Sequence, residues 1–252
     1  MLLITEQQIL GWLAALLLPF FRIIGIFFAA PVLSARSFPV RARVGLALLL
    51  SLLAAPLVPG PTPGFDDPAI WALLATELMV GLAIGLVARM LLSAVDLAGE
   101  TIGLQMGLSF AGFFDPGGGT GNAVGRLLST ASLAAFVAAD GPALLLAATL
   151  HGIGADAGGA ASANFLAQIP FARIATTVFE LGILIALPYM ALLLFVNLAL
   201  GVMSRVAPQL NVFAIGFPIT IGAGLLLLAV GLPMIAQPLG RIHEQILRHV
   251  GL

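Results

Sequence analysis

The chain has 252 residues, of which 61% are hydrophobic and only 8% are charged, with a formal net charge of −1 and a mean hydropathy of +1.15. Soluble domains carry about 25% charged residues, so this composition predicts a membrane protein. The chain contains no cysteine, which excludes disulfides and thiolate metal sites, and its charge gives no basic surface for nucleic acid. We expect an all-α protein with a single integral membrane domain over residues 1–252.

Apolar segments follow one another along most of the chain and indicate its helices. An α-helix rises 1.5 Å per residue, so about 20 residues cross a ~30 Å hydrocarbon core. About six segments meet or approach this length, at residues 9–32, 44–58, 69–94, 123–150, 171–203 and 212–236. Several are broken by proline or glycine, and charged residues such as Arg22, Glu77 and Glu180 lie inside them. A charge at the membrane centre costs about 2.5–3.5 kcal/mol, so these side chains should face protein or water.

Two connections between the first apolar segments predict which side of the membrane each connection and the N-terminus lie on. Segment 34–43 carries three arginines, whereas segment 59–68 is rich in proline and carries two aspartates. The positive-inside rule places the arginine-rich connection in the cytoplasm and the N-terminus outside. Segment 212–236 departs from the rule, because arginines lie on both sides of it. Either the C-terminal arginines are mis-sorted, or this segment is a re-entrant hairpin bent at Pro218 and Gly222.

Residues 96–107 combine two acidic side chains with regularly spaced glycines. The glycines recur every four residues, at Gly99, Gly103 and Gly107. On a helix this spacing makes a smooth stripe where another backbone can approach closely. Asp96 and Glu100 are spaced to share one helix face. They either form structural ion pairs with Arg89 and Arg126 or line a path for ions or protons.

The run 103–116 leads from this stripe into a compact apolar sequence. Pro116 disfavours a helical Asp115, so the chain is expected to turn there. A cluster suited to plug a pore consists of Met106, Phe110, Phe113, Phe114, Gly117, Gly118 and Gly119. Bulky side chains beside a deformable glycine loop can close a pore and then move aside. The alternative is ordinary core packing followed by a loop.

The run 197–218 places polar groups around a break at Pro208. These groups belong to Asn197, Arg205, Gln209 and Asn211. Amide and guanidinium groups between apolar segments must be satisfied by neighbours. Together with Asp96 and Glu100, they form the predicted set of buried polar residues that support assembly.

Motifs for catalysis or cofactor binding do not stand out. His243 and His249 are six residues apart, about 240° around a helix, so they cannot hold one zinc ion from a single helix. The glycine cluster 117–121 is not followed by the lysine that a phosphate-binding loop needs. No serine, histidine and aspartate set has the spacing of a hydrolase motif. We therefore expect no enzymatic activity, no metal site and no cofactor.

Four parts of the sequence carry a resemblance to a known family, at residues 103–116, 197–218, 30–33 and 41–47. The first two closely, and the last two more loosely, resemble the FliR family, the flagellar members of the export-gate subunits of type III protein secretion. The likeness extends over essentially the whole chain in length and segment order. One departure is Pro142, which stands after Asp140 and Gly141 where the family often has histidine.

The resemblance implies a fold, a function and partners. Family members form bent helical hairpins packed in a hetero-oligomeric gate with FliP-type and FliQ-type subunits, and further export-apparatus membrane proteins are expected. The implied role is a non-enzymatic subunit of the flagellar export gate, located in the bacterial inner membrane at the flagellar basal body. Unfolded flagellar proteins pass through this gate during flagellum assembly, and the family's pore-closing loop corresponds to residues 107–122. The alternative is a secondary transporter or ion pathway for a small solute, which predicts an inverted repeat that the sequence does not convincingly show.

Overall fold

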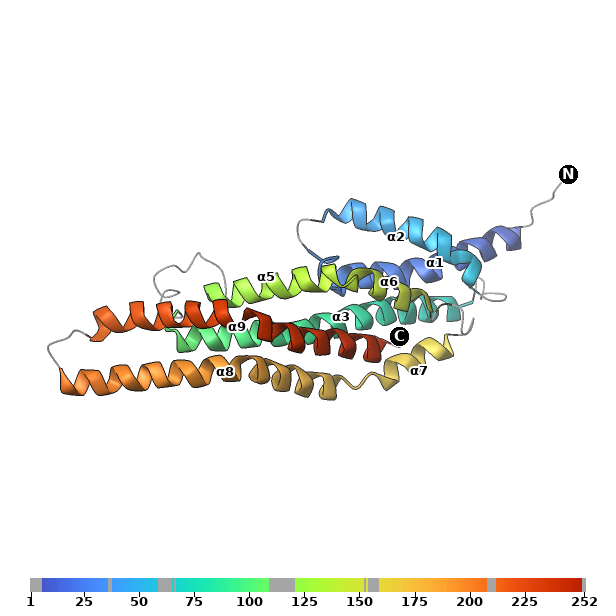
Figure 1. The fold of residues 1–252 in the computed structure, drawn as a ribbon. Helices are drawn as coiled ribbons and strands as arrows, with labels where there is room; N and C mark the ends of the chain where they lie inside the picture. Colours follow the sequence, from blue (N-terminus) through green and yellow to red (C-terminus); the bar gives the residue numbers. More distant parts are fainter. Residues whose placement is uncertain are drawn as a thin grey trace. The chain divides into compact units, whose positions relative to one another are not determined.

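The computed structural model describes residues 6–35, 38–58, 65, 67–108, 121–151, 153, 159–207 and 212–250. Within these residues every regular element is helical (Figure 1). The helices are α1 (Glu6–Ala29), α2 (Val40–Ala54), the 3₁₀ helix η1 (Ala55–Leu57), α3 (Ala69–Gln105), α5 (Ala123–Ala138), α6 (Gly141–His151), α7 (Ala160–Gln168), α8 (Phe171–Val206) and α9 (Val212–Val250). The side chains of residues 6–9, 151, 212–214, 232–234, 236 and 250 fall outside the description.

Helix length and composition confirm the expected all-α membrane class. Among the described residues, four helical stretches are long and apolar enough to cross a membrane: Leu10–Ala29, Val40–Leu57, Ala69–Gln105 and Phe171–Val206. A fifth span is possible if α5 and α6 count as one interrupted span, and α9 contains a shorter apolar stretch, Ile215–Gly231. These stretches correspond to the six apolar segments of the sequence.

The interruption between α5 and α6 follows from three consecutive residues. Asp140 has a left-handed backbone with a φ of 55°, a conformation that aspartate tolerates better than most side chains. Gly141 and Pro142 then begin α6, and proline is compatible with a first helical turn because its missing N–H has no helical partner there. The sequence predicted one segment tolerating these residues at depth, whereas the structure ends one helix and starts another.

Two predicted helix limits are wrong. The segment expected to end at residue 94 continues as α3 through Gly99 and Gly103 and ends at Gln105, so Gly107 lies beyond the helix with a φ of 77°. The hairpin alternative at Pro218 and Gly222 also fails, because α9 is one helix from Val212 to Val250. Proline removes one helical hydrogen bond and can bend a helix, but it does not by itself reverse the chain.

The sequence predicts the structure of two further short segments, one of them wrongly. Residues 152–163 are rich in small residues and are expected to form a loop, but α7 already begins at Ala160. Residues 238–250 are expected to form an amphipathic tail, and they are helical as the last part of α9. In that part Ile242 and Ile246 are almost fully buried, so the apolar face of the tail packs against the protein.

The backbone divides into two compact units, each described here by itself. Unit 1 comprises residues 1–89, 136–171 and 245–252, and unit 2 comprises residues 90–135 and 172–244. Helices α3, α5 and α9 contribute residues to both units. The single domain expected over residues 1–252 stays a prediction.

Close contacts between α1 and α3 build unit 1. A Cβ at Gly25 would lie 2.6 Å from the backbone carbonyl oxygen of Leu78, and a Cβ at Gly81 would overlap the carbonyl of Arg22. Gly85 lies equally close to the backbone of Ala30. Glycine therefore lets the two helix backbones touch, as small residues do in membrane helix packing. Helix α1 also packs against α2 and α6.

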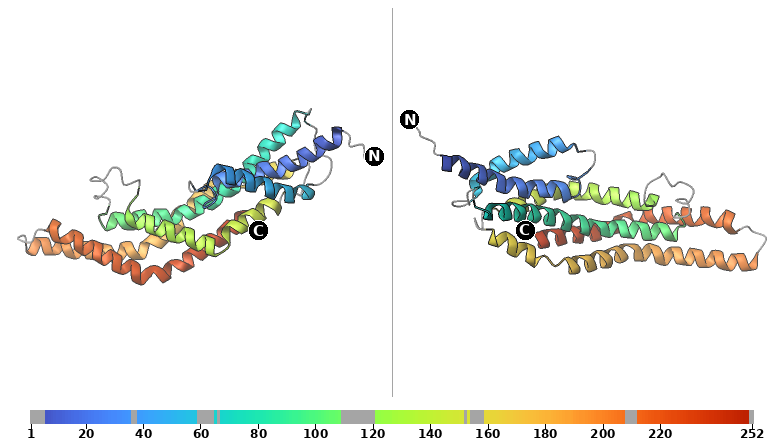
Figure 2. Two further views of the ribbon diagram at one scale, coloured as in Figure 1. Left: turned by 90° about the horizontal axis from the view of Figure 1, so that it is seen from above. Right: turned by 180° about the vertical axis from the view of Figure 1, so that it is seen from behind.

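Unit 2 is built around the second half of α3 and the antiparallel helices α8 and α9, which lie side by side (Figures 1 and 2). A Cβ at Gly99 would lie 2.6 Å from the Cα of Gly125 in α5. A Cβ at Gly182 in α8 would lie 3.0 Å from the carbonyl oxygen of Ala94 in α3. The Gly99 contact confirms a close backbone approach at that member of the predicted glycine stripe.

Candidate functional site

Directly after segment 109–120, Asn122 before α5 is held by Glu100 in α3. The backbone N–H of Asn122 donates to Glu100 Oε1 at 3.1 Å, and the Asn122 side-chain amide donates to Glu100 Oε2 at 2.9 Å. The same amide also donates to the Glu100 carbonyl at 3.1 Å. Asn122 Oδ1 accepts from the backbone N–H of Gly125 at 2.8 Å, which makes Asn122 the N-cap of α5. We call this arrangement the Glu100–Asn122 clamp.

Two glycines make room for the Glu100–Asn122 clamp. The Asn122 side chain fills the space that a Cβ at Gly103 would need. Gly121 has a φ of 108°, and a Cβ there would lie 2.6 Å from Glu100 Oε1. A left-handed backbone favours glycine because a side chain would be strained. At Gly103 the close neighbour is therefore an asparagine side chain, and not the backbone of another helix that the stripe predicted.

Met106 lies on the other side of the same segment and is fully buried. Its side chain occupies the space beside Gly224 in α9, and its carbonyl accepts a long hydrogen bond of 3.4 Å from the Thr220 hydroxyl. Gly107 follows with a φ of 77°, and the Phe217 ring lies 2.7 Å from the position of a Cβ there. Met106 thus anchors the beginning of the predicted plug run in the core of unit 2.

Most of the predicted plug falls outside the described residues. These members are Phe110, Phe113, Phe114, Gly117, Gly118 and Gly119. Gln209 and Asn211, from the predicted polar set, also fall outside them. The pore plug and the role of these two amides stay predictions.

Asn197 is the member of the second run that reaches toward Met106 and Gly107. Its side-chain amide donates to the backbone carbonyl of Gln105, at a long distance of 3.4 Å. A cavity of about 440 Å³ lies beside this contact and is lined by residues of α3, α8 and α9, including Gly201 and Phe217. The two runs singled out in the sequence therefore meet at one place in unit 2.

The expected ion pairs of Asp96 and Glu100 are not formed by the described residues. Glu100 is hydrogen-bonded to Asn122, and the Arg126 guanidinium donates to the carbonyl of Gly121 at 3.1 Å. The reason is local: the first turn of α5 offers N–H groups and the positive end of a helix dipole to the Glu100 carboxylate. Asp96 and Arg89 are both exposed and have no partner among the described residues.

Arg205 is exposed near the end of α8 and also lacks a partner among the described residues. Burial of Arg205 in an assembly stays a prediction.

A second polar centre lies buried in unit 1 and joins four helices. Arg22 Nε donates to Glu77 Oε2 at 2.5 Å, and Arg22 Nη2 donates to the Ser162 hydroxyl at 2.7 Å. The Ser162 hydroxyl donates in turn to Glu77 Oε1 at 2.7 Å. Arg22 Nη1 donates to the Thr149 carbonyl at 3.3 Å. We call these groups the Arg22–Glu77 network.

The sequence identified part of this network. Arg22 and Glu77 were expected to face protein or water because they lie inside apolar segments, and the structure buries both within the protein. Ser162 was missed, since it follows a stretch of small residues that looked like an uninformative loop. In the sequence Ser162 is a single hydroxyl residue among small residues, and the structure places it in the first turn of the short helix α7. Serine at such a position is common and does not indicate a distant ion pair.

The chemistry available at these centres is structural. Carboxylate, guanidinium and amide groups satisfy one another, and a fully connected buried polar network rigidifies the elements that it joins. The part of the chain that the structure describes contains no group of three or more His, Cys, Asp or Glu side chains placed to hold a metal ion. The two centres therefore fix helix positions on either side of segment 109–120 and between α1, α3, α6 and α7.

Comparisons with known proteins cover nearly the whole chain. Residues 13–246 match the family described as bacterial export proteins, family 1. The flagellar biosynthetic protein FliR of Pectobacterium carotovorum subsp. carotovorum is 39% identical over 240 residues, which cover 93% of this chain and 90% of that protein. FliR of Escherichia coli (strain K12) is 37% identical over 94% of this chain and 91% of that protein. FliR of Bacillus subtilis (strain 168) is 33% identical over 91% of this chain and 90% of that protein.

Proposed function

The chain belongs to the bacterial export proteins of family 1 and to the FliR proteins within it, and we propose that it is a non-enzymatic subunit of the flagellar type III export gate. The proposal places it in the bacterial inner membrane at the flagellar basal body. It assembles there with FliP-type and FliQ-type subunits. Unfolded flagellar proteins pass through the gate as substrates. The observation that carries this function is the family match over residues 13–246.

The exposed apolar helices support a role in an assembly. Only 22% of the most apolar window of α2 is buried in the chain, and the same fraction holds for α8. Leu194, Phe195 and Leu198 of α8 are each more than 60% exposed. Contiguous apolar surface of this kind marks a membrane-facing or subunit-facing side. Partner subunits and lipid together cover it in the proposed gate.

The expected plug becomes part of the same proposal. Phe110, Phe113 and Phe114 close the pore, and the glycines 117–119 let the segment move when a substrate arrives. Support comes from the flanks of the segment, since Met106 is buried on one side and Asn122 is clamped by Glu100 on the other. Fixed flanks limit where the segment between them can reach.

The gate assignment is tested by a deletion strain and by co-purification. A strain lacking this protein should lose motility and export of flagellar proteins, and the wild-type chain supplied in trans should restore both. A tagged chain should purify together with FliP-type and FliQ-type subunits. Normal flagellum assembly in the deletion strain would contradict the proposal, and so would purification of the functional chain without either subunit.

The plug is tested by changing the three phenylalanines together to alanine. Export-gate complexes should still assemble, but membrane conductance and solute uptake per assembled complex should rise because the apolar constriction is lost. A matched control changes Phe171, Phe179 and Phe195, which are exposed on α8, to alanine. The plug variant should leak and the control should not.

If the three phenylalanines pack in a core instead, the result reverses. Phe→Ala in a packed interior costs about 3–5 kcal/mol, so the amount of complex would fall while permeability per complex stayed normal. That pattern would contradict the plug.

A further inference from the structure

Unit 1 carries both tryptophans of the chain, Trp12 in α1 and Trp71 in α3. Both side chains are exposed, to 63% and 62% respectively. Neither indole N–H donates a hydrogen bond within the described part of the chain. Tryptophan buries most of its surface in an average protein, so two exposed indoles indicate surroundings outside the chain that accept both the apolar ring and the N–H group.

The two tryptophans lie at the same end of unit 1. Helices α1 and α3 run in the same direction, because Arg22 contacts Glu77, 55 residues further on, and the glycine contacts advance along both helices together. The beginnings of the two helices therefore lie at one end (Figures 1 and 2). The same offset places Trp71 about one helical turn deeper than Trp12, which is about 6 Å along the axis.

A buried apolar cluster fixes the backbone at this level. It consists of Ala14, Leu18, Ile70, Leu73 and Leu74. Val58, which follows η1, packs against the same cluster, so the end of the α2–η1 segment also lies here. Trp71 directly follows a member of the cluster, and Trp12 lies two residues before another. Both tryptophans are therefore held on a packed support.

Exposed side chains change character in a fixed order along this end of unit 1. Outermost is Asp67, whose carboxylate accepts a hydrogen bond of 2.9 Å from the backbone N–H of Ala69. The two tryptophans come next. Leu57, Leu53 and Leu49 follow along η1 and α2 toward the middle of the unit and are all exposed. The order of carboxylate, indole and leucine matches the passage from water through the headgroup region into hydrocarbon.

The other end of α2 provides the opposite boundary. Arg41 is exposed in the first turn of α2, and Val40–Leu57 is one of the stretches long and apolar enough to cross a membrane. This stretch has a cation at one end and Asp67 with the tryptophans at the other. The tryptophans therefore lie at a membrane boundary and not at depth.

We propose that Trp12 and Trp71 bind the headgroup region of the lipid bilayer and hold this end of unit 1 at that depth. Their rings lie against the glycerol region and the first carbons of the acyl chains, and their indole N–H groups donate to ester or phosphate oxygens. A bilayer about 40–45 Å thick with a ~30 Å hydrocarbon core has an interfacial layer of about 5–8 Å on each side. The axial separation of about 6 Å between the two tryptophans fits one such layer.

Lipid explains this surface better than a partner subunit does. Tryptophan is also enriched at protein interfaces, but a protein partner does not require carboxylate, indole and leucine to follow one another along the helix axis. A bilayer does require this order, because its polarity changes along the same axis. The inference depends on the membrane location of the chain and not on the export function, so its failure leaves the proposed function intact.

The test uses the full chain, purified with the subunits that accompany it and placed in phosphatidylcholine nanodiscs. Because the chain has no cysteine, Trp12→Cys and Trp71→Cys each provide one site on it for a nitroxide spin label. The complex with the wild-type chain gives the background from other subunits. Collisions of the label with oxygen, which concentrates in hydrocarbon, and with a water-soluble nickel chelate report its depth. Both labels should collide with both reagents to an intermediate extent.

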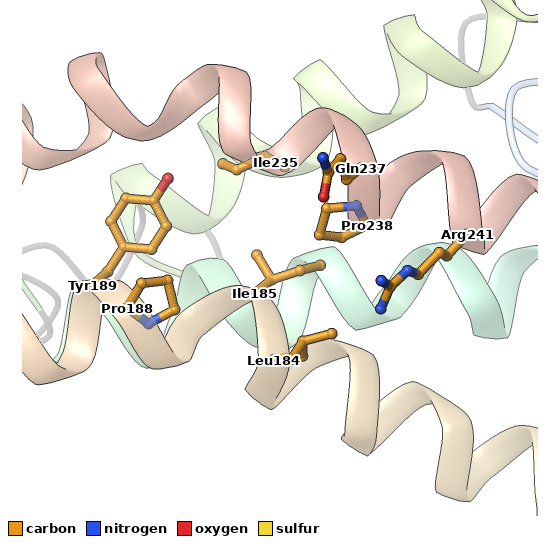
Figure 3. A pocket seen from close by; sticks show the side chains of 8 residues that line it. All are labelled: Leu184, Ile185, Pro188, Tyr189, Ile235, Gln237, Pro238 and Arg241. Atoms are coloured by element: carbon orange, nitrogen blue, oxygen red, sulfur yellow. The ribbon is translucent and has the colours of Figure 1, made fainter.

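Three labelled variants provide the reference values. Leu49→Cys places the label on an exposed residue in the middle of α2, and Pro68→Cys places it on an exposed residue beyond the helices. Leu49→Cys should collide mainly with oxygen and Pro68→Cys mainly with the nickel chelate. Ile185→Cys represents a site covered by protein, because Ile185 is buried between α8 and α9 beside a cavity of about 280 Å³ that leaves room for part of the label (Figure 3). It should collide weakly with both reagents.

A second measurement leaves the tryptophans in place. The fluorescence of the wild-type complex, minus that of the double variant Trp12→Phe with Trp71→Phe, isolates the signal of these two side chains. Brominated phosphatidylcholine quenches tryptophans that its bromine atoms touch. Bromine near the glycerol end of the acyl chain should quench this signal more strongly than bromine near the methyl end.

The same two measurements separate the results that would overturn the proposal. Weak collisions with both reagents, as in Ile185→Cys, together with no quenching by either lipid, would show that a protein covers the tryptophans. Values equal to those of Pro68→Cys would place them in water. Values equal to those of Leu49→Cys, with stronger quenching by the deeper bromine, would place them in the hydrocarbon core.

Discussion

At the scale of single residues, a charged side chain of this apolar chain is buried where a hydrogen-bond donor or acceptor from elsewhere in the fold reaches it, and exposed where none does. Glu77 is buried because Arg22 and Ser162 satisfy both of its carboxylate oxygens. Glu100 is satisfied by Asn122 at the start of α5. Asp96, one turn before Glu100, has no such neighbour among the described residues and stays exposed.

Removal of one partner from the Arg22–Glu77 network should destabilise unit 1. Glu77→Ala leaves the Arg22 guanidinium buried without a carboxylate, and breaking a buried ion pair in this way costs about 3–5 kcal/mol. The double variant Arg22→Met with Glu77→Leu should be less destabilised than Glu77→Ala, because no buried charge remains. The free energy of unfolding in detergent, measured on chains purified with their subunits, checks both expectations.

The matched control for this prediction is Glu180→Ala. Glu180 is exposed in α8 and has no partner within the described residues, so its removal should leave unfolding nearly unchanged. Equal stability of Glu77→Ala and Glu180→Ala would show that the Arg22–Glu77 network does not stabilise the fold.

At the scale of helices, glycine decides which pairs of helices can touch. Gly25, Gly81 and Gly85 bring the backbones of α1 and α3 into contact, and Gly99 does the same for α3 and α5. Gly45 in the middle of α2 is different, because no atom lies within 4 Å of the position of its Cβ. The same residue type is therefore required at some positions and replaceable at others.

This difference predicts opposite effects of one substitution. Gly81→Ala should destabilise the chain by about 1–3 kcal/mol, because its Cβ would overlap the backbone of Arg22 and force α1 away from α3. Gly45→Ala should stabilise it by about 0.5–1 kcal/mol, since alanine favours a helix where space is open. Unfolding midpoints of the two variants, compared with the wild-type chain, should move in opposite directions. A shift of the same sign in both would contradict the assigned contacts.

At the scale of the whole molecule, the chain buries polar centres within its two units but leaves long apolar faces uncovered. The exposed residues of α2 include Leu49, Leu52 and Leu53, and those of α8 include Phe195 and Leu198. A membrane covers part of such surface, but its hydrocarbon provides no partner for exposed polar groups such as those of Asp96 and Arg205. Partner subunits are the natural source of these missing contacts.

Stability should therefore depend on co-expression. The chain produced without partners should aggregate in detergent or unfold at low temperature. Co-expression with FliP-type and FliQ-type subunits should raise its unfolding temperature, because partners that bind only the folded state stabilise that state. Size-exclusion chromatography and thermal unfolding measure the difference. A monodisperse chain that is equally stable with and without these subunits would argue against an obligate assembly.

The sequence alone determined the class of the protein and the position of most helices, because hydrophobicity is local information that a single segment carries. It also located Arg22 and Glu77 as charges inside apolar segments, and it placed Gly99 and Gly103 on one face of α3, since helix geometry converts spacing into a shared face. The resemblance of residues 103–116 and 197–218 to the FliR family identified the function, and the comparisons confirm that family.

Only the tertiary structure decided which partner each polar group finds. Ser162 lies 85 residues from Glu77, and Asn122 lies 22 residues from Glu100, so neither pairing has a local signal. Arginine was the expected partner of Glu100 because charge was the only clue available in the sequence. The N-terminus of α5 provides its donors instead, since the fold brings backbone and amide N–H groups to the carboxylate at a distance of a hydrogen bond.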